Sequence, residues 1–254
     1  MIRRSYIVIF LTLVYAVLWI GGVLTHLLEW KNTNYQLVFA SLFLWTAAIL
    51  SLSGRLSVGN VVKVLSAALL AYVAEIIGVT TGVIFGTYYY NESFGDKLFG
   101  VPLVIFAAWL ILFTYVQHVV STFQLPHLIK ALCGALWMVA IDMIIDPVCV
   151  GIIQFWSWKE TGAYYDIPFS NFVGWFVVSL VMFLMFPLPF FKQVSSHLVG
   201  FTLILFFTSL AATAYPIAAV VGIVLMIADV IFLQKEWQHY YKTLHHSLRK
   251  VLAN

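Results

Sequence analysis

Long apolar stretches separated by short polar or turn-forming segments run the whole length of the chain. A stretch of about 20 apolar residues is long enough to cross a bilayer as a helix. Breaks at Pro, Gly and charged residues divide the sequence into eight such stretches. The predicted helices cover residues 5–24, 36–53, 61–80, 101–121, 128–146, 172–191, 197–213 and 216–233.

The last division depends on a single turn. Residues 198–233 are almost continuously apolar and only Ala214-Tyr215-Pro216 offers a break, so seven helices are the alternative. Basic residues favour eight, because Lys and Arg concentrate on the cytoplasmic side of membrane proteins. With eight spans and a cytoplasmic N-terminus, ten basic residues lie on the cytoplasmic side (Arg3, Arg4, Arg55, Lys63, Lys130, Lys192, Lys235, Lys242, Arg249, Lys250) and three on the other (Lys31, Lys97, Lys159).

Composition supports the same interpretation. The chain is 63% hydrophobic and 9% charged, with a mean hydropathy of +1.00, which excludes a water-soluble globular protein. We therefore predict an all-α, polytopic transmembrane bundle of about eight spans with both termini cytoplasmic. Residues 1–254 form one integral membrane domain in a cell membrane, either a bacterial inner membrane or an archaeal plasma membrane.

The two ends of the chain carry separate expectations. The first apolar stretch follows Arg3-Arg4 as in a signal peptide, but no Ala-x-Ala pattern follows it, so we expect it to stay as the first span. The tail at residues 234–254 mixes aromatic and aliphatic residues with His and Lys, which is typical of an interfacial amphipathic helix.

Other chemistry has little support in the sequence. The net charge of +3 reports topology first, and nothing indicates nucleic acid binding. The only cysteines, Cys133 and Cys149, stand in no metal or redox motif. His26, His118, His127 and His197 lie near span ends on both membrane faces, so we expect structural roles for them and no metal cluster.

Four acidic residues fall inside the predicted spans, where an ionisable side chain is costly and usually functional. Asp142 and Asp146 are four residues apart, on one face of a helix about one turn from each other. Because Pro147 cannot donate a backbone hydrogen bond, we expect this helix to end or kink at Asp146. Burial, the neighbouring carboxylate and the helix end all disfavour the charged form, so at least one carboxyl is expected to stay protonated and serve as a general acid.

Glu75 belongs at the same outer depth as this pair, because its helix and theirs run in the same direction. Three carboxyls should therefore converge beneath two long connectors, at residues 81–100 and 147–171. The alternative is that these carboxyls only bond to neighbouring helices and fix their packing. Asp229, which stands alone near the interface, is expected to have that structural role.

The two connectors are rich in glycine and aromatic residues. An aromatic belt at the lipid headgroups explains part of this composition. It does not explain Gly162, Pro168, Asn171 and Gly174, which indicate a defined backbone path and hence a folded cap over a cavity.

These residues resemble those of the membrane carotenoid 1,2-hydratases, the family that also serves bacterioruberin synthesis. The likeness spans residues 75–175, about two fifths of the 254-residue chain, in two blocks. The first block contains Glu75, Gly78, Thr81-Gly82, Phe85-Gly86, Tyr88, Tyr90, Gly95, Gly100-Val101-Pro102 and Ala108-Trp109. The second contains Asp142, Asp146-Pro147, Trp156, Trp158, Tyr164-Tyr165, Ile167-Pro168, Asn171-Phe172 and Gly174-Trp175.

The resemblance implies an enzyme, a hydro-lyase that adds water to the terminal C1=C2 double bond of an acyclic carotenoid end and forms a tertiary alcohol. Asp146 or Asp142 would be the acid, and Glu75 with Asn171 would hold the water and accept its proton. The other candidate substrate-binding residues are Tyr88, Tyr90, Trp156, Trp158, Tyr164 and Trp175.

The resemblance also implies a lipophilic carotenoid substrate within membrane lipid and, as further candidate partners, other enzymes of the carotenoid pathway. Neither a cofactor nor a metal is required. A carotenoid is a rigid rod about as long as the hydrocarbon core is thick, roughly 30 Å, so one end would meet the outer carboxyls. The connectors would then act as a lid over that end.

Three alternatives stay open at this point. A cyclase or isomerase acting on the same end group also begins with protonation, and exclusion of water would decide between them. A proton-coupled transporter would need carboxyls spread through the membrane depth. An intramembrane aspartyl protease would need Asp residues on two different helices.

Overall fold

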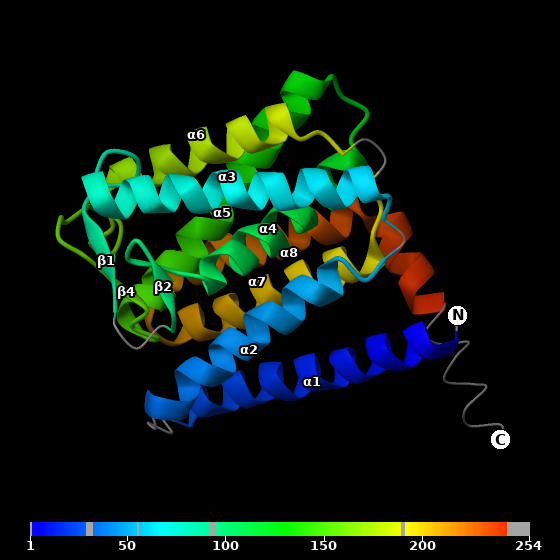
Figure 1. The fold of residues 1–254 in the computed structure, drawn as a ribbon, viewed down its shortest axis with the longest axis horizontal. Coiled ribbons are helices and arrows are strands. Elements are labelled where there is room, and N and C mark those ends of the chain that lie inside the picture. Colours follow the sequence, from blue (N-terminus) through cyan, green and yellow to red (C-terminus); the bar gives the residue numbers. More distant parts are fainter. Residues whose placement is uncertain (1, 29–32, 55, 92–94, 189–190, 243–254) are drawn as a thin grey trace.

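The computed structural model describes residues 2–28, 33–54, 56–91, 95–188 and 191–242, which form a bundle of long helices (Figure 1). All eight expected helices occur among these described residues, so the predicted all-α bundle is confirmed. Their bounds are α1 Ile2–Leu27, α2 Thr33–Ser51, α3 Val58–Thr81, α4 Val104–Ser121, α5 His127–Gly151, α6 Phe169–Met185, α7 Val194–Ala214 and α8 Pro216–Phe232.

Helix length and exposed apolar surface identify a membrane protein. Among the described residues, five helices are long and apolar enough to cross a bilayer, and a sixth qualifies if α8 is joined to the bent segment Gln234–Lys242. The apolar segments Val38–Ser51 and Phe169–Met185 are shorter. At a rise of ~1.5 Å per residue, the 17 residues of α6 span about 26 Å, somewhat less than the hydrocarbon core.

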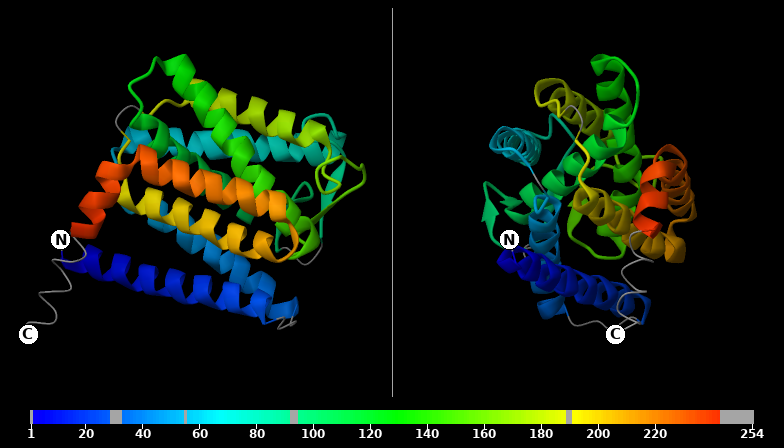
Figure 2. Two further views of the ribbon diagram at one scale, coloured as in Figure 1. Left: turned by 180° about the vertical axis from the view of Figure 1, so that it is seen from behind. Right: turned by 90° about the vertical axis from the view of Figure 1, so that its right-hand side faces the viewer.

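The bundle is layered around α4. This helix packs against α2, α3, α5 and α7, and 83% of its span is buried within the protein. By contrast, only 6% of the Tyr6–His26 span in α1 is buried, and Figure 2 shows α1 along one edge of the bundle with α5 and α6 toward the opposite edge. An apolar helix with so little burial needs lipid, not water, as its solvent.

The sequence predicts that helix α5 ends or kinks at Asp146, and the first of these two outcomes is wrong. Pro147 lies inside the helix, which continues to Gly151. A proline removes the hydrogen bond to the carbonyl four residues earlier, here Met143. The Tyr164 hydroxyl donates to that carbonyl at 2.8 Å and replaces the missing bond, which allows the helix to continue.

The two connectors fold together at one end of the bundle. β1 (Tyr88–Tyr90) pairs antiparallel with β4 (Trp156–Trp158), and β2 (Lys97–Leu98) pairs with β3 (Val101–Pro102). We call the β1–β4 pair the aromatic ribbon. In Figure 1 it lies at the end of the bundle opposite the start of α1 and the end of the Gln234–Lys242 segment.

Two glycines place this ribbon over the helices. Gly82 ends α3 with φ 70° and its N–H bonds the carbonyl of Gly78, a left-handed cap that residues with a Cβ adopt at a cost. Gly174 lets α6 touch the first connector, because a Cβ there would lie 2.4 Å from the carbonyl oxygen of Ile84.

The tail prediction covers residues 234–254, of which 243–254, including His245 and His246, lie outside the described residues. Within Gln234–Lys242 the chain is helical and bends 78° away from α8. The Trp237 indole N–H donates to Asp229 at 2.9 Å, so this part of the tail packs against the bundle.

Candidate active site

The aromatic ribbon presents four rings on one face. Strand residues two apart point the same way, and the register pairs Tyr88 with Trp158 and Tyr90 with Trp156. The ring centroids lie 4.8 Å apart in the first pair and 5.8 Å apart in the second. Tyr89, between the two tyrosines, points away and is 48% exposed.

Strand β1 binds the carboxyl of Glu75, which is buried near the end of α3. The Tyr88 and Tyr90 hydroxyls both donate to Oε2, the latter at 2.9 Å. From α4, the Trp109 indole N–H donates to Oε1 at 3.0 Å. Three donors on one buried carboxyl are the arrangement that stabilises the charged form.

Tyr88 lies between the acidic residues. Burial raises the pKa of its phenol well above the ordinary value, and the negative charge of Glu75 raises that pKa further, with a smaller contribution from Asp146. The phenol therefore keeps its proton and acts as a hydrogen-bond donor.

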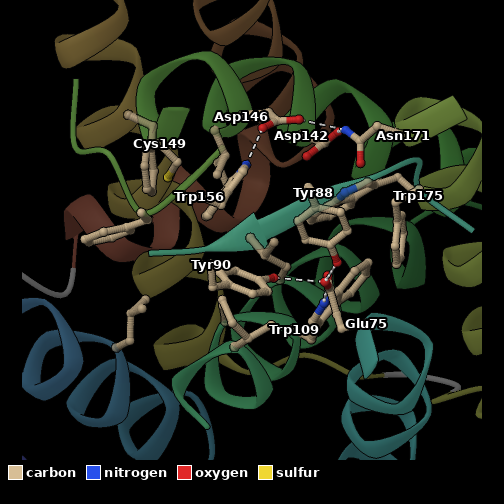
Figure 3. Close-up of a pocket in the computed structure, with 18 of the residues that line it drawn as sticks. Glu75, Tyr88, Tyr90, Trp109, Asp142, Asp146, Cys149, Trp156, Asn171 and Trp175 are labelled. Atoms are coloured by element: carbon tan, nitrogen blue, oxygen red, sulfur yellow. Dashed lines mark hydrogen bonds between the residues drawn. The ribbon is translucent and has the colours of Figure 1, made fainter. Parts of the chain in front are cut away.

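Asp142 and Asp146 lie one turn apart on α5, both buried and both facing Asn171 of α6 (Figure 3). The Asn171 amide nitrogen donates to Oδ2 of Asp142 at 2.7 Å and to Oδ2 of Asp146 at 2.8 Å. Strand β4 binds the other oxygen of Asp146, with Trp156 and Trp158 donating at 2.6 Å and 3.2 Å. Asp146 thus accepts three hydrogen bonds, whereas a single one is found for Asp142 among the described residues.

All three carboxyls line one cavity, which we call the carboxyl cavity. In the view of Figure 3 the two aspartates lie on one side of β1 and Glu75 on the other. Among the described residues, no Lys, Arg or His lines this cavity. Three negative charges without a cation would repel one another in this buried site.

The cavity extends from the carboxyls toward the middle of the bundle. This extension, which we call the apolar arm, is lined by side chains from α2, α4 and α7. The residues are Leu44, Ile105, Ala108, Leu112, Leu203 and Phe207.

Most of the predicted substrate-binding residues are in this lining, with two differences. Tyr164 is outside it and bonds the Met143 carbonyl instead. Asn171 lines the cavity and bonds both aspartates, and its role with Glu75 in holding the water stays a prediction. Trp175 lines the cavity and stacks on Trp109, with ring centroids 4.2 Å apart.

Sequence reasoning missed several residues of the site. Trp109, a donor to Glu75, and Phe85 were noted only as parts of a motif, and Cys149 and Phe155 also line the cavity. No local signal marks these side chains, because their place depends on how α4 and the connectors pack. The catalytic roles of Asp146, Asp142 and Glu75 stay predictions.

A second buried polar cluster lies near the other end of the bundle. Asp229 stands alone in the sequence but has several partners in the fold. It accepts hydrogen bonds from Tyr115 at 2.8 Å and from Trp237 at 2.9 Å, and it lies 3.0 Å from His197 Nε2. His118 stacks on His197 with ring centroids 4.7 Å apart. These contacts join α4, α7, α8 and the tail, which agrees with a structural role for Asp229.

Among the described residues, no group of three or more His, Cys, Asp or Glu side chains is arranged to hold a metal ion.

Comparison with known proteins adds two findings. The family model described as carotenoid biosynthesis protein matches residues 35–229. The bisanhydrobacterioruberin hydratase of Haloarcula japonica (strain ATCC 49778 / DSM 6131 / JCM 7785 / NBRC 101032 / NCIMB 13157 / TR-1) is 28% identical over 127 residues, which are 48% of this chain and 43% of the relative. The match thus spans less than half the length of that relative. No solved structure gives a significant match.

Proposed function

This chain belongs to the carotenoid biosynthesis protein family, and we propose that it is a carotenoid 1,2-hydratase that adds water to the C1=C2 double bond of an acyclic end group by acid catalysis. One observation carries the proposal: Glu75, Asp142 and Asp146 line a single cavity under the aromatic ribbon, and that cavity continues into an apolar arm. The name of the Haloarcula relative supports the reaction class.

The aspartates supply the proton. Because none of the described residues that line the cavity is a cation, Asp142 and Asp146 act as a pair that shares one proton, with the Asn171 amide bonded to both. Transfer of this proton to C2 forms the C2–H bond and uses the π electrons of the double bond. A tertiary cation is left at C1, and the aspartate pair has lost one proton.

Glu75 is the partner that receives a proton. Like Asp146 it accepts three hydrogen bonds, but its donors are not shared with a second carboxyl, so we assign it as the carboxylate that orients a water molecule and accepts a proton from it. The water oxygen bonds to C1, one of its O–H bonds breaks, and Glu75 becomes protonated. Return of that proton to the aspartate pair completes the cycle, and no electrons are gained or lost.

The aromatic ribbon shields the cation. The rings of Tyr88, Tyr90, Trp156 and Trp158 are fixed by their hydrogen bonds to the acids, so their faces are in place before the charge forms. A ring face attracts a nearby cation by roughly 0.5–2 kcal/mol. The ribbon also covers the carboxyl cavity and limits the water that reaches the cation.

The apolar arm holds the polyene. Its lining of Leu, Ile, Ala and Phe side chains has no polar group that a hydrocarbon would leave unpaired, and it lies between α2, α4 and α7 along the helices. A linear hydrocarbon placed there brings its end to the carboxyls. This arrangement favours a long acyclic substrate over a compact one.

Expression of the full chain in a lycopene-producing bacterium, followed by mass spectrometry of the pigments, tests the function. We expect a product heavier than the substrate by one water, or by two if both ends react. An isomer of the substrate would instead indicate a cyclase or isomerase, and unchanged pigment from correctly inserted protein would contradict the proposal.

The same assay tests the acid. Asp146→Asn keeps the side-chain shape but cannot share the proton, so we expect no hydrated product although the protein still accumulates in the membrane. Asp229→Asn is the matched control, because that carboxyl lies outside the carboxyl cavity. Product formation by Asp146→Asn at the wild-type rate would remove the assignment.

A further inference from the structure

A second cavity, lined mainly by basic and apolar side chains, lies near the end of the bundle opposite the aromatic ribbon. We call it the basic cavity. It is formed by the start of α3, the end of α4, the start of α5, the end of α6 and the segment after α6. Its lining residues are Lys63, Gln117, Val120, Ser121, Leu125, His127, Lys130, Ala131, Phe183, Pro187 and Leu188.

The positive charge of this cavity is not balanced by acidic groups. Among the described residues, no Asp or Glu is in the lining and neither lysine forms an ion pair. Lys63 Nζ donates to the carbonyl of Pro187 at 3.0 Å, a neutral partner that orients the ammonium group and leaves its charge in place. Elsewhere at this end of the bundle Lys192 is paired with Glu236 at 2.8 Å, so lysines here are not generally left uncompensated.

The start of α5 adds partial positive charge to the basic cavity. Its N-cap residue, Pro126, makes no side-chain capping bond, so the first backbone N–H groups keep the partial positive charge of the helix terminus. His127 and Lys130 stand on that first turn, and Ser121 and Gln117 add polar side chains to the lining. The combination is suited to an oxyanion with several acceptor oxygens, such as a phosphate group.

We propose that the basic cavity binds the phosphate group of an anionic membrane lipid. Basic pockets between transmembrane helices on the cytoplasmic side favour such headgroups. The neighbouring surface is apolar, with Leu125, Leu128 and Leu184 exposed by 44%, 55% and 38%, which provides a path for the acyl chains. A free phosphate would use the same polar groups but would leave that apolar surface unused.

This proposal does not depend on the hydratase assignment. The basic cavity and the carboxyl cavity have no lining residue in common. Loss of lipid binding can therefore occur without loss of hydration chemistry, and the reverse is also possible.

Native mass spectrometry of the full chain, purified in detergent and titrated with phosphatidylglycerol, is the direct test. Phosphatidylcholine, which has no net charge, is the comparison lipid. We expect phosphatidylglycerol adducts on the wild type, and a Lys63→Gln/Lys130→Gln variant should bind it about 30-fold more weakly, since each lysine near the membrane surface contributes a factor of about five. Lys130→Gln alone should bind phosphatidylglycerol about five-fold more weakly than the wild type. This single variant guards against misfolding of the double variant.

Lys192→Gln/Lys235→Gln is the charge-matched control, because it removes two lysines outside the basic cavity. It should bind phosphatidylglycerol within about two-fold of the wild type, as expected for surface charges screened by salt. Equal binding by all variants, or equal binding of the two lipids, would overturn the proposal. Displacement of the lipid by an equal concentration of inorganic phosphate would assign the cavity to free phosphate and overturn the choice of a lipid.

Discussion

The substitution Tyr90→Phe tests the proposed role of the aromatic ribbon most selectively. The change removes one hydroxyl and keeps the ring, which lies 5.5 Å from the Tyr88 ring and 5.8 Å from the Trp156 ring between centroids. The hydroxyl donates to Glu75 Oε2 at 2.9 Å in a buried site, so water cannot easily replace it. The perturbation therefore removes the hydroxyl's bond to the buried carboxyl together with its contact with the Tyr88 hydroxyl.

The size of the effect follows from that bond. A hydrogen bond to a charged group contributes about 1.5–3 kcal/mol. If the loss falls on the transition state, kcat/KM decreases about 10- to 150-fold, at 1.36 kcal/mol for each factor of ten. Two donors to Glu75 remain, from Tyr88 and Trp109, so activity should be reduced and not abolished.

The assay is hydration of an acyclic carotenoid by membranes that contain equal amounts of each variant. Tyr89→Phe is the matched control, because this tyrosine is in the same strand but points away and is 48% exposed. We expect the control to keep the wild-type rate. The reasoning is refuted if Tyr90→Phe hydrates as fast as the wild type, or if Tyr89→Phe is equally impaired.

Three further predictions concern the supports of the site. Tyr164→Phe leaves the Met143 carbonyl without its donor, so thermal unfolding in detergent should show a loss of about 1–3 kcal/mol, and an unchanged melting temperature would contradict this account of the helix at Pro147. Gly174→Ala places a Cβ 2.4 Å from the Ile84 carbonyl oxygen, so we expect both the melting temperature and the hydration rate to decrease. Gly59→Ala, with open space around its Cβ position, should change neither quantity. Ala108→Phe should fill the apolar arm and stop hydration of long carotenoids without lowering the melting temperature by more than a few degrees, and normal turnover would place the polyene elsewhere.

The sequence predicts the helices well because their signal is local. Apolar runs, turn residues and the distribution of Lys and Arg locate all eight, and the single turn at Tyr215-Pro216 is enough to separate α7 from α8. The four-residue spacing of Asp142 and Asp146 likewise places both on one helix face before any packing is considered.

Contacts between distant segments are what the pattern cannot supply. Pro147 predicts a helix end or kink, but the helix continues to Gly151, and Tyr164, 17 positions later in the chain, provides the missing donor. The pairing of Tyr88 with Trp158 depends on a register between two connectors on either side of α4 and α5. Asp229 is isolated in the sequence, yet Tyr115, His197 and Trp237 surround it in the fold.

The origin of the new hydrogen on the product tests the central claim most directly. In heavy water the aspartate pair carries a deuteron, and its transfer to C2 forms a C–D bond that ordinary water cannot exchange afterwards. We predict one such deuterium for each hydrated end, as measured by mass spectrometry after the product is returned to ordinary water, and no product at all from Asp146→Asn. Hydrated product without deuterium at C2 would contradict protonation by these carboxyls.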